Sequence, residues 1–418
     1  MRTQPKIKKR NALTDLFYVL FVSCYLVVLL IWGMGASFSQ LRYYILALAV
    51  IVAGAGLILR KKIHIYGKNL LLVIPLGLLF FAISLLRANE AHHAIFFRTY
   101  VQISLIVLPA LYAMLLMNLL KMSSLVKLMQ FTLICTIIIY FMEPGHRITD
   151  FVNAKNWMNI SILHSDSFTE SSLCSEIFLN LFVFFNFYKN AKGLKTSQKS
   201  IKISYGISLV FTILCFKRLA ILFVLCIIVL NKIIDWRGQI TKYFVPFLPI
   251  FFTAATVLYT EFMKGNLFPG FDVYNFTTGR DYILSLWEQL DYVSYGYGSS
   301  MILIGRYLEM DLVQIFMELN IIALFAFAFV FFKIAGTNIY SIVTMTYAFF
   351  NMLTASSLPS SLSWVIAFLT IASISSDKCK QEKIYITAQK SRMKKLFSKK
   401  KGKEKNVSAS ISYNSTQI

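Results

Sequence analysis

Charged side chains are scarce in this 418-residue chain, and acidic side chains are the scarcest. Only 15% of the residues are charged, whereas 57% are hydrophobic. Soluble globular domains carry about 25% charged residues, so the composition excludes a soluble domain of this length. Many apolar runs reach the ~20 residues that cross ~30 Å of hydrocarbon. The sequence therefore predicts an all-α, polytopic integral membrane protein.

Cysteine and histidine are also few, with 6 and 5 residues respectively. Most of the cysteines fall in or beside apolar segments, and no Cys-x-x-Cys pair occurs in the sequence. No His/Cys cluster has metal-ligand spacing. The sequence therefore implies neither disulfides nor a metal site, and we expect no cofactor.

The basic excess has a topological explanation. The chain holds 42 Lys and Arg but 19 Asp and Glu, for a net charge of +23. The cations gather in alternate loops and in the C-terminal tail, as the positive-inside bias distributes them. No recognition fold remains for DNA or RNA, so we expect no nucleic-acid partner.

The apolar runs predict about 12 transmembrane helices in residues 1–376, with both termini in the cytoplasm. The expected spans are residues 16–33, 43–59, 70–86, 100–120, 128–142, 173–188, 203–216, 219–234, 243–259, 312–332, 338–356 and 362–375. One large extracytoplasmic loop is expected at about 261–311, between the ninth and tenth spans. A polar loop of this kind can carry chemistry or recognition. We expect 377–418 to be a basic, disordered cytoplasmic tail against anionic membrane lipid.

Two short spans flank the pair Lys217-Arg218, which the span count places at the outer end. The pair could be a simple turn whose cations reach the outer headgroups. Alternatively, it is a cationic site for a lipid-linked phosphate. Arg218 is then the stronger candidate, because guanidinium binds phosphate through two parallel hydrogen bonds.

The external loop holds a second candidate in the turn Thr277-Thr278-Gly279-Arg280-Asp281. It could be a loop connection and nothing more. Alternatively, Arg280 and Asp281 border an aromatic platform of Tyr282 and Trp287 that binds sugar rings. Arg98 is expected on the same side, as a surface cation or as part of the site.

Carboxylates near the end of this loop are the third candidate. Glu318 lies in an apolar context and should face the bundle interior, where it either contacts substrate or braces backbone. Glu309 and Asp311 lie near the outer mouth, and helical spacing puts them on different faces. Either could act as a general base. The alternative bases are His92, His93, His146 and His164.

Several motifs resemble those of bacterial polysaccharide polymerases of the Wzy type and the related O-antigen ligases. Lys217-Arg218-Leu219-Ala220 resembles that superfamily's Ser-Arg turn. Thr278-Gly279-Arg280 and Tyr295-Gly296-Tyr297-Gly298 resemble its G-R…W…G-x-G loop. Residues 312–322 resemble its helix L-x-x-l-x-E-x-G-I-I-G. Glu309-Met310 stands where ligases have His-Asn, which favours a polymerase.

The resemblance implies a metal-independent glycosyltransferase on the outer face of the cytoplasmic membrane. Such enzymes transfer the growing glycan from undecaprenyl diphosphate to a sugar hydroxyl of a new undecaprenyl-diphosphate-linked oligosaccharide. Arg218 and Arg280 would hold the diphosphate and Glu309 would be the base, with Lys217, Arg98, Asp281, Tyr282, Trp287 and Glu318 binding substrate. A chain-length regulator and a separate flippase are the implied partners. The alternatives are a flippase of the same lipid-linked repeat and a polysaccharide ligase.

Overall fold

The computed structural model describes residues 12–386, apart from 34–40, 60–64, 144–170, 234–240, 269–271, 278, 290–292, 304, 306–307 and 377. Over these residues the chain is helical, and its two strands have 2 residues each. The expected all-α class is therefore confirmed. Helical structure suits an apolar chain, because a helix satisfies its backbone hydrogen bonds internally.

The helices and strands have the following bounds. They are α1 (Ala12–Gly33), α2 (Leu41–Leu59), the 3₁₀ helix η1 (Lys68–Leu72), α3 (Val73–Glu90), α4 (Phe97–Leu119), α5 (Met122–Met142), α7 (Ser172–Tyr188), β1 (Ala191–Lys192), α8 (Gln198–Leu214), α9 (Arg218–Ile233), α10 (Thr241–Phe244), α11 (Phe247–Met263), α12 (Val273–Thr277), α13 (Arg280–Gln289), α14 (Ser299–Leu303), α15 (Asp311–Glu318), α16 (Ile321–Ala335), α17 (Ile339–Thr354), α18 (Ser361–Ser375), α19 (Lys378–Gln381) and β2 (Tyr385–Ile386).

Each expected span overlaps one or two of these helices, and the ninth begins in α10 and continues into α11. In the described part of the chain, 3 segments are long and apolar enough to cross a membrane, and 8 shorter apolar helices accompany them. The long segments are Lys68–Glu90, Phe97–Leu119 and Met122–Met142. The tenth expected span differs from the prediction, because it is divided into α15 and α16.

The centre of the bundle is α18, which packs on α4 and α7 and is buried along most of its length. Aromatic rings fill the space around it. Trp364 lies 5.4 Å from both Phe331 and Phe368, measured between ring centroids.

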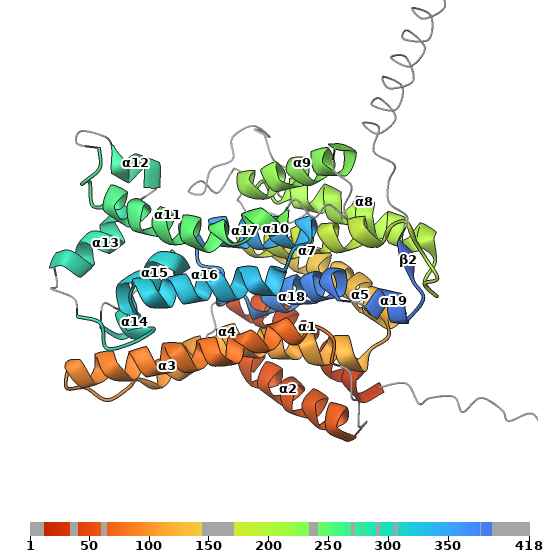
Figure 1. Ribbon diagram of the computed structural model, residues 1–418, viewed down its shortest axis with the longest axis horizontal. Coiled ribbons are helices and arrows are strands. Elements are labelled where there is room, and N and C mark those ends of the chain that lie inside the picture. Colours follow the sequence, from red (N-terminus) through yellow and green to blue (C-terminus); the bar gives the residue numbers. More distant parts are fainter. Residues whose placement is uncertain are drawn as a thin grey trace, which may run out of the picture.

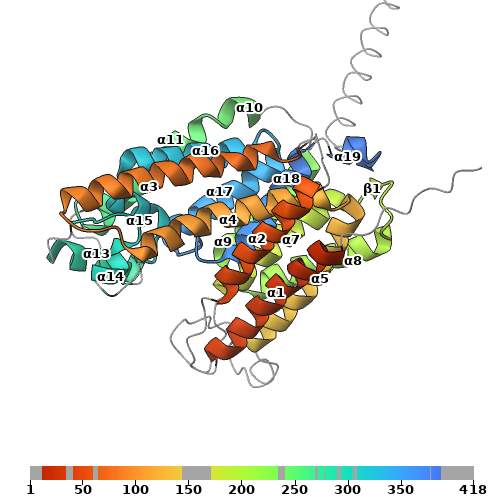
Figure 2. The same cartoon turned by 90° about the horizontal axis from the view of Figure 1, so that it is seen from below.

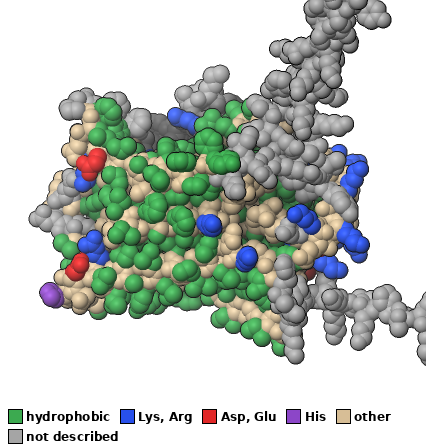
Figure 3. Space-filling view, in the orientation of Figure 1, with side chains coloured by type: hydrophobic (Ala, Val, Ile, Leu, Met, Phe, Trp, Pro, Cys, Tyr) green, Lys and Arg blue, Asp and Glu red, His purple; other side chains and the backbone are tan. Residues whose placement is uncertain are grey.

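In the turned view, α1, α2 and α5 form a group beside α3, α4 and α16 (Figure 2). The outer surface carries a broad hydrophobic area, as expected of helices in contact with lipid (Figure 3).

The bundle has two ends of different composition. Helices α12–α15 gather at one end with the connection between α3 and α4, whereas β1, β2 and α19 lie at the other (Figure 1). Lys and Arg side chains gather at the β1–β2 end (Figure 3).

Loops that were expected on the same side of the membrane do meet. The Lys195 amide donates to Ser123 Oγ (3.0 Å), and the Met122 amide donates to Glu382 Oε2 (3.0 Å). At the opposite end, the Ser171 amide donates to the Cys215 carbonyl (3.2 Å). The polar connections therefore separate into two sets, one at each end of the bundle.

The C-terminal segment corrects one expected boundary. The tail was expected to be disordered from 377, but residues 378–386 form α19 and β2, and β2 pairs antiparallel with β1. The Lys378 ammonium donates to the carbonyls of Met117 and Leu120, at the end of α4. The ordered bundle therefore extends past the expected boundary, while the rest of the tail lies outside the described residues.

Candidate functional site

The glycine-rich turn Tyr295–Gly298 lies close against two neighbouring helices. Gly296 and Gly298 have positive φ angles of 110° and 85°, a region that glycine adopts without strain. A Cβ on Gly296 would lie 2.8 Å from the Cβ of Ser84 in α3. A Cβ on Gly298 would lie 3.0 Å from Gln102 and 3.6 Å from Arg98 in α4. The two glycines therefore let the turn lie directly against two long helices.

The carboxylate of Glu318 holds this turn from the opposite side. It accepts hydrogen bonds from the backbone amides of Gly298 (2.6 Å) and Ser300 (2.9 Å) and from Gln314 Nε2 (3.0 Å). Glu318 is fully buried, which confirms that it faces the bundle interior. Its contacts match the bracing alternative, since both oxygens are engaged by the protein itself. A direct contact with substrate stays a prediction.

Tyr297 anchors the turn in the bundle. Its amide donates to Ser84 Oγ (3.1 Å), and its buried ring lies edge-on to Phe80, with centroids 5.5 Å apart. Burial raises the pKa of the Tyr297 phenol well above its ordinary value, and the charges of Asp311 and Glu318 raise it further. The contacts of Tyr297 with Ser84 and Phe80 therefore hold the turn against α3.

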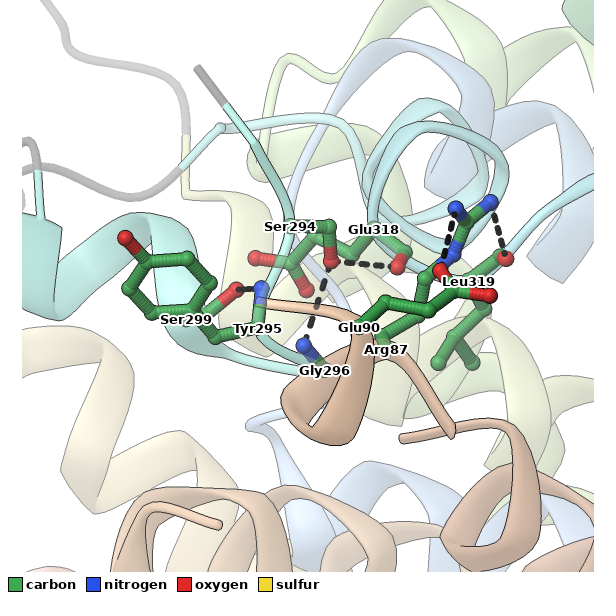
Figure 4. A network of polar contacts seen from close by, with 8 residues as sticks. All are labelled: Arg87, Glu90, Ser294, Tyr295, Gly296, Ser299, Glu318 and Leu319. Carbon is green, nitrogen blue, oxygen red and sulfur yellow. Dashed lines mark hydrogen bonds and ion pairs between the residues drawn. The ribbon is translucent and has the colours of Figure 1, made fainter. Parts of the chain in front are cut away.

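A break between α15 and α16 supports the same turn (Figure 4). Asn320 adopts φ 156° and ψ −178°, a conformation that costs a non-glycine residue ~1–3 kcal/mol. The carbonyls released by the break have partners: Ser294 Oγ donates to the Glu318 carbonyl, and Arg87 Nη2 donates to the Leu319 carbonyl (3.4 Å). The Asn320 side chain accepts from the Ala323 amide (2.9 Å), which caps α16.

Arg98 is the predicted cation that the structure places beside this turn. It lies in the first turn of α4, and its Cγ packs next to Gly298. Its guanidinium is within electrostatic range of the Glu318 carboxylate. The structure therefore brings together Arg98 and Glu318, which are far apart in the sequence.

Helix α13 begins at Arg280 and packs by its apolar side. Arg280 Nη1 donates to the Thr277 carbonyl (3.2 Å), and the Thr277 hydroxyl donates to Asp281 Oδ1 (2.8 Å). Trp287 is 2% exposed and packs in a cluster with Leu284 and with residues of α11 and α15, while Tyr282 is exposed. The expected sugar platform of Tyr282 and Trp287 is therefore not formed, because the indole anchors α13 to the bundle.

The Lys217-Arg218 pair joins two short helices, as expected, but the two side chains point differently. Phe216 before them has φ 53°, which makes the turn tight. Arg218 is exposed, whereas Lys217 is buried and its charge acts on the Glu176 carboxylate. Helix α9 packs on α7, α8 and α17, while α13 packs on α11 and α12. Arg218 and Arg280 therefore begin helices that pack in different parts of the molecule.

Glu176 is part of a buried polar network that was not predicted from the sequence. Its carboxylate accepts hydrogen bonds from Ser363 Oγ (2.8 Å) and from the Asn351 amide group. Asp311 accepts from the backbone amides of Ser357 (2.6 Å) and Leu358 (2.7 Å), and so fixes the connection between α17 and α18. A single acidic residue inside an apolar segment indicates a buried polar site. Glu176 has such surroundings in the sequence, as Glu318 does.

Asp311 begins α15, whereas Glu309 precedes the helix, so the expected helical spacing does not relate their side chains. Asp311 is buried, whereas Glu309 is exposed between the fully buried Leu308 and Met310. The alternative bases His92 and His93 are exposed at the same end, while His146 and His164 lie outside the described residues. Exposed groups suited to accept a proton are therefore present beside the turn and before α15.

The described residues contain no group of three His, Cys, Asp or Glu side chains that could hold a metal ion. Comparisons of the chain with protein-family models, with curated proteins and with solved structures gave no match.

Proposed function

We propose that this protein is an oligosaccharide repeat-unit polymerase of the cytoplasmic membrane. It transfers the growing glycan from undecaprenyl diphosphate to a sugar hydroxyl of a new lipid-linked repeat unit. The observation that carries the proposal is the position of Arg98. This cation is held at the end of an apolar bundle, against a glycine turn that the buried Glu318 fixes. A cation held at the end of an apolar bundle can bind the diphosphate of a lipid-linked substrate.

The leaving diphosphate requires compensation of its charge. Guanidinium groups form paired, charge-assisted hydrogen bonds with phosphate, and these strengthen where water is excluded. Arg98, Arg280 and Arg218 supply these groups in the proposal, with Lys217 as a buried neighbour of Arg218.

The acceptor hydroxyl requires a base. Glu309 is one candidate for this base, because its side chain is exposed between α14 and α15. Asp311 is not, since it is buried and bound to backbone amides. Asp281 and Tyr282 lie on α13 next to Arg280, where they are available to sugar hydroxyls.

The proposal places the α12–α15 end outside the cell and the Lys-rich end inside, with about 12 helices crossing the membrane. The supporting observation is the separation of the connections into two sets. In this orientation the site faces the leaflet that receives lipid-linked repeats. A flippase that delivers the repeats and a regulator of chain length complete the proposed system.

A cell that lacks the gene tests the proposal. Complementation by the wild-type chain should restore long polymer, while Arg98→Ala, Arg280→Ala and Arg218→Ala should leave single repeats on the lipid. Lys192→Ala, at the opposite end, is the matched control and should restore polymer. Retained long polymer in all three arginine variants would falsify the site.

The location of the unpolymerised repeats separates the alternatives. A polymerase defect leaves lipid-linked single repeats on the outer leaflet. Repeats that stay on the inner leaflet would instead indicate a flippase. Free long polymer without attachment to its acceptor would indicate a ligase.

A further inference from the structure

Three aromatic rings meet where the α3–α4 connection touches the glycine turn. The His93 and Tyr295 rings are stacked, with centroids 5.0 Å apart and an interplanar angle of 14°. Phe96 contacts both, at 4.7 Å from His93 and 6.2 Å from Tyr295. These contacts position the His93 ring on the turn, although the side chain is exposed.

One ring nitrogen of His93 has a defined role. Nδ1 lies 2.7 Å from the Ala94 carbonyl oxygen. A carbonyl oxygen can only accept a hydrogen bond, so Nδ1 must carry the proton. In the neutral imidazole the lone pair is then on Nε2. The backbone of His93 is also fixed, because its amide donates to the Ala88 carbonyl (2.8 Å).

This arrangement is that of an oriented base. A general base acts when its free nitrogen is held at the reacting proton and its other nitrogen is fixed by a hydrogen bond. The charged groups on the adjoining elements are Arg87 and Glu90, which form an ion pair at 3.4 Å on α3, and Arg98 on α4. Tyr295 begins the turn that Gly298 ends, so the imidazole and Arg98 lie at opposite ends of one short turn.

We propose that His93 is the general base of the glycosyl transfer. The inference rests on the proposed polymerase function and names the base that this function requires. Nε2 takes the proton of the acceptor hydroxyl as that oxygen forms its bond to the anomeric carbon. The bond from the anomeric carbon to the phosphate oxygen breaks, and its electron pair leaves with undecaprenyl diphosphate. The imidazolium then returns its proton to water.

The competing base, Glu309, is held less firmly. It is exposed between two buried residues, and among the described residues no hydrogen bond to its carboxylate is found. His93 has both a ring stack and a fixed tautomer. Because general base catalysis depends on geometry before proton affinity, the fixed imidazole is the better candidate.

The test uses the full-length protein in membranes from cells that lack the native gene. Donor and acceptor are the lipid-linked repeats that accumulate in those cells. His93→Phe keeps a ring on Tyr295 but has no nitrogen, and its polymerisation rate should fall by about 100-fold or more. In His93→Ala, added imidazole should restore part of the rate. Glu309→Gln tests the competing base and should lose less rate than His93→Phe, while His92→Asn should keep the wild-type rate.

Three results would overturn the inference. They are a wild-type rate in His93→Phe, a rate in His93→Ala that imidazole leaves unchanged, and a loss of rate in Glu309→Gln or His92→Asn that equals the loss in His93→Phe. These failures concern the base alone, because the wild-type protein still polymerises. If the wild-type protein itself forms no polymer from these repeats, the proposed function fails instead.

Discussion

The Glu318 carboxylate accepts a hydrogen bond of 2.6 Å from the backbone amide of Gly298. Gly298 lies just before α14, whereas Glu318 is the last residue of α15. This contact ties the glycine turn to the helix break and, through Gly298, to Arg98 in α4. The Glu318 carboxylate therefore links the glycine turn, the helix break and α4.

Replacing Glu318 should destabilise the protein. Glu318→Ala leaves the amides of Gly298 and Ser300 buried without acceptors, at a cost of ~1–3 kcal/mol for each unsatisfied group. Glu318→Gln is the milder change, because one acceptor oxygen remains. The unfolding temperature of the purified protein in detergent should fall in the order wild type, Gln, Ala. An Ala variant as stable as the wild type would show that the carboxylate does not brace the turn.

Comparing Gly296→Ala with a control variant should separate the effect of the contact with Ser84 from the effect of backbone strain on stability. Its Cβ would lie 2.8 Å from the Ser84 Cβ, and the residue would keep a positive φ. Overpacking of this kind costs ~1–3 kcal/mol in addition to the strain. Gly305→Ala is the matched control, since Gly305 also has a positive φ (75°) but no atom within 4 Å of an added Cβ. We expect a larger drop in unfolding temperature for Gly296→Ala, and equal drops would exclude the contact with Ser84.

Asn320 has a strained backbone, and its side chain caps α16. Asn320→Ala keeps the unfavourable φ of 156° and removes the cap on the Ala323 amide. Asn320→Gly removes the cap but relieves the strain, so it should be less destabilising than Asn320→Ala by ~1 kcal/mol or more. Asn320→Asp keeps an acceptor for the cap and should resemble the wild type. Thermal unfolding of the three variants checks this order, and an Ala variant more stable than the Gly variant would contradict it.

The proposed orientation predicts which positions an impermeant reagent reaches in intact cells. A membrane-impermeant maleimide should label His92→Cys and Glu309→Cys, both exposed at the α12–α15 end. Lys195→Cys, at the β1–β2 end, should react only after the membrane is permeabilised. The wild-type chain, with its own cysteines, gives the background. Labelling of the Lys195 position alone would reverse the orientation and remove the site from the outer leaflet.

The positions of the helices could be predicted from the sequence because they follow from local composition. Apolar runs separated by cationic connections specify helices wherever they occur, and the short helices on either side of Lys217-Arg218 illustrate this. The apolar surroundings of Glu318 likewise placed its carboxylate inside the bundle. These features depend on residues close together in the chain.

The contacts within the site could not be predicted in the same way. Trp287 was predicted to have an exposed role, but it packs against residues of α11 and α15, which bury it. The apolar surroundings of Glu176 were visible in the sequence, but its partners on α17 and α18 are distant in sequence and could not be predicted. Local patterns carry no information on which helices become neighbours.

The sequence by itself determined that this chain is a bundle of apolar helices with its charge in the connections, because each helix needs only its own backbone to satisfy its hydrogen bonds. Only the tertiary structure decided that Arg98, the glycine turn and Glu318 meet, and that His93 stacks on Tyr295. The physical reason is that these contacts join segments whose proximity depends on the packing of the whole bundle.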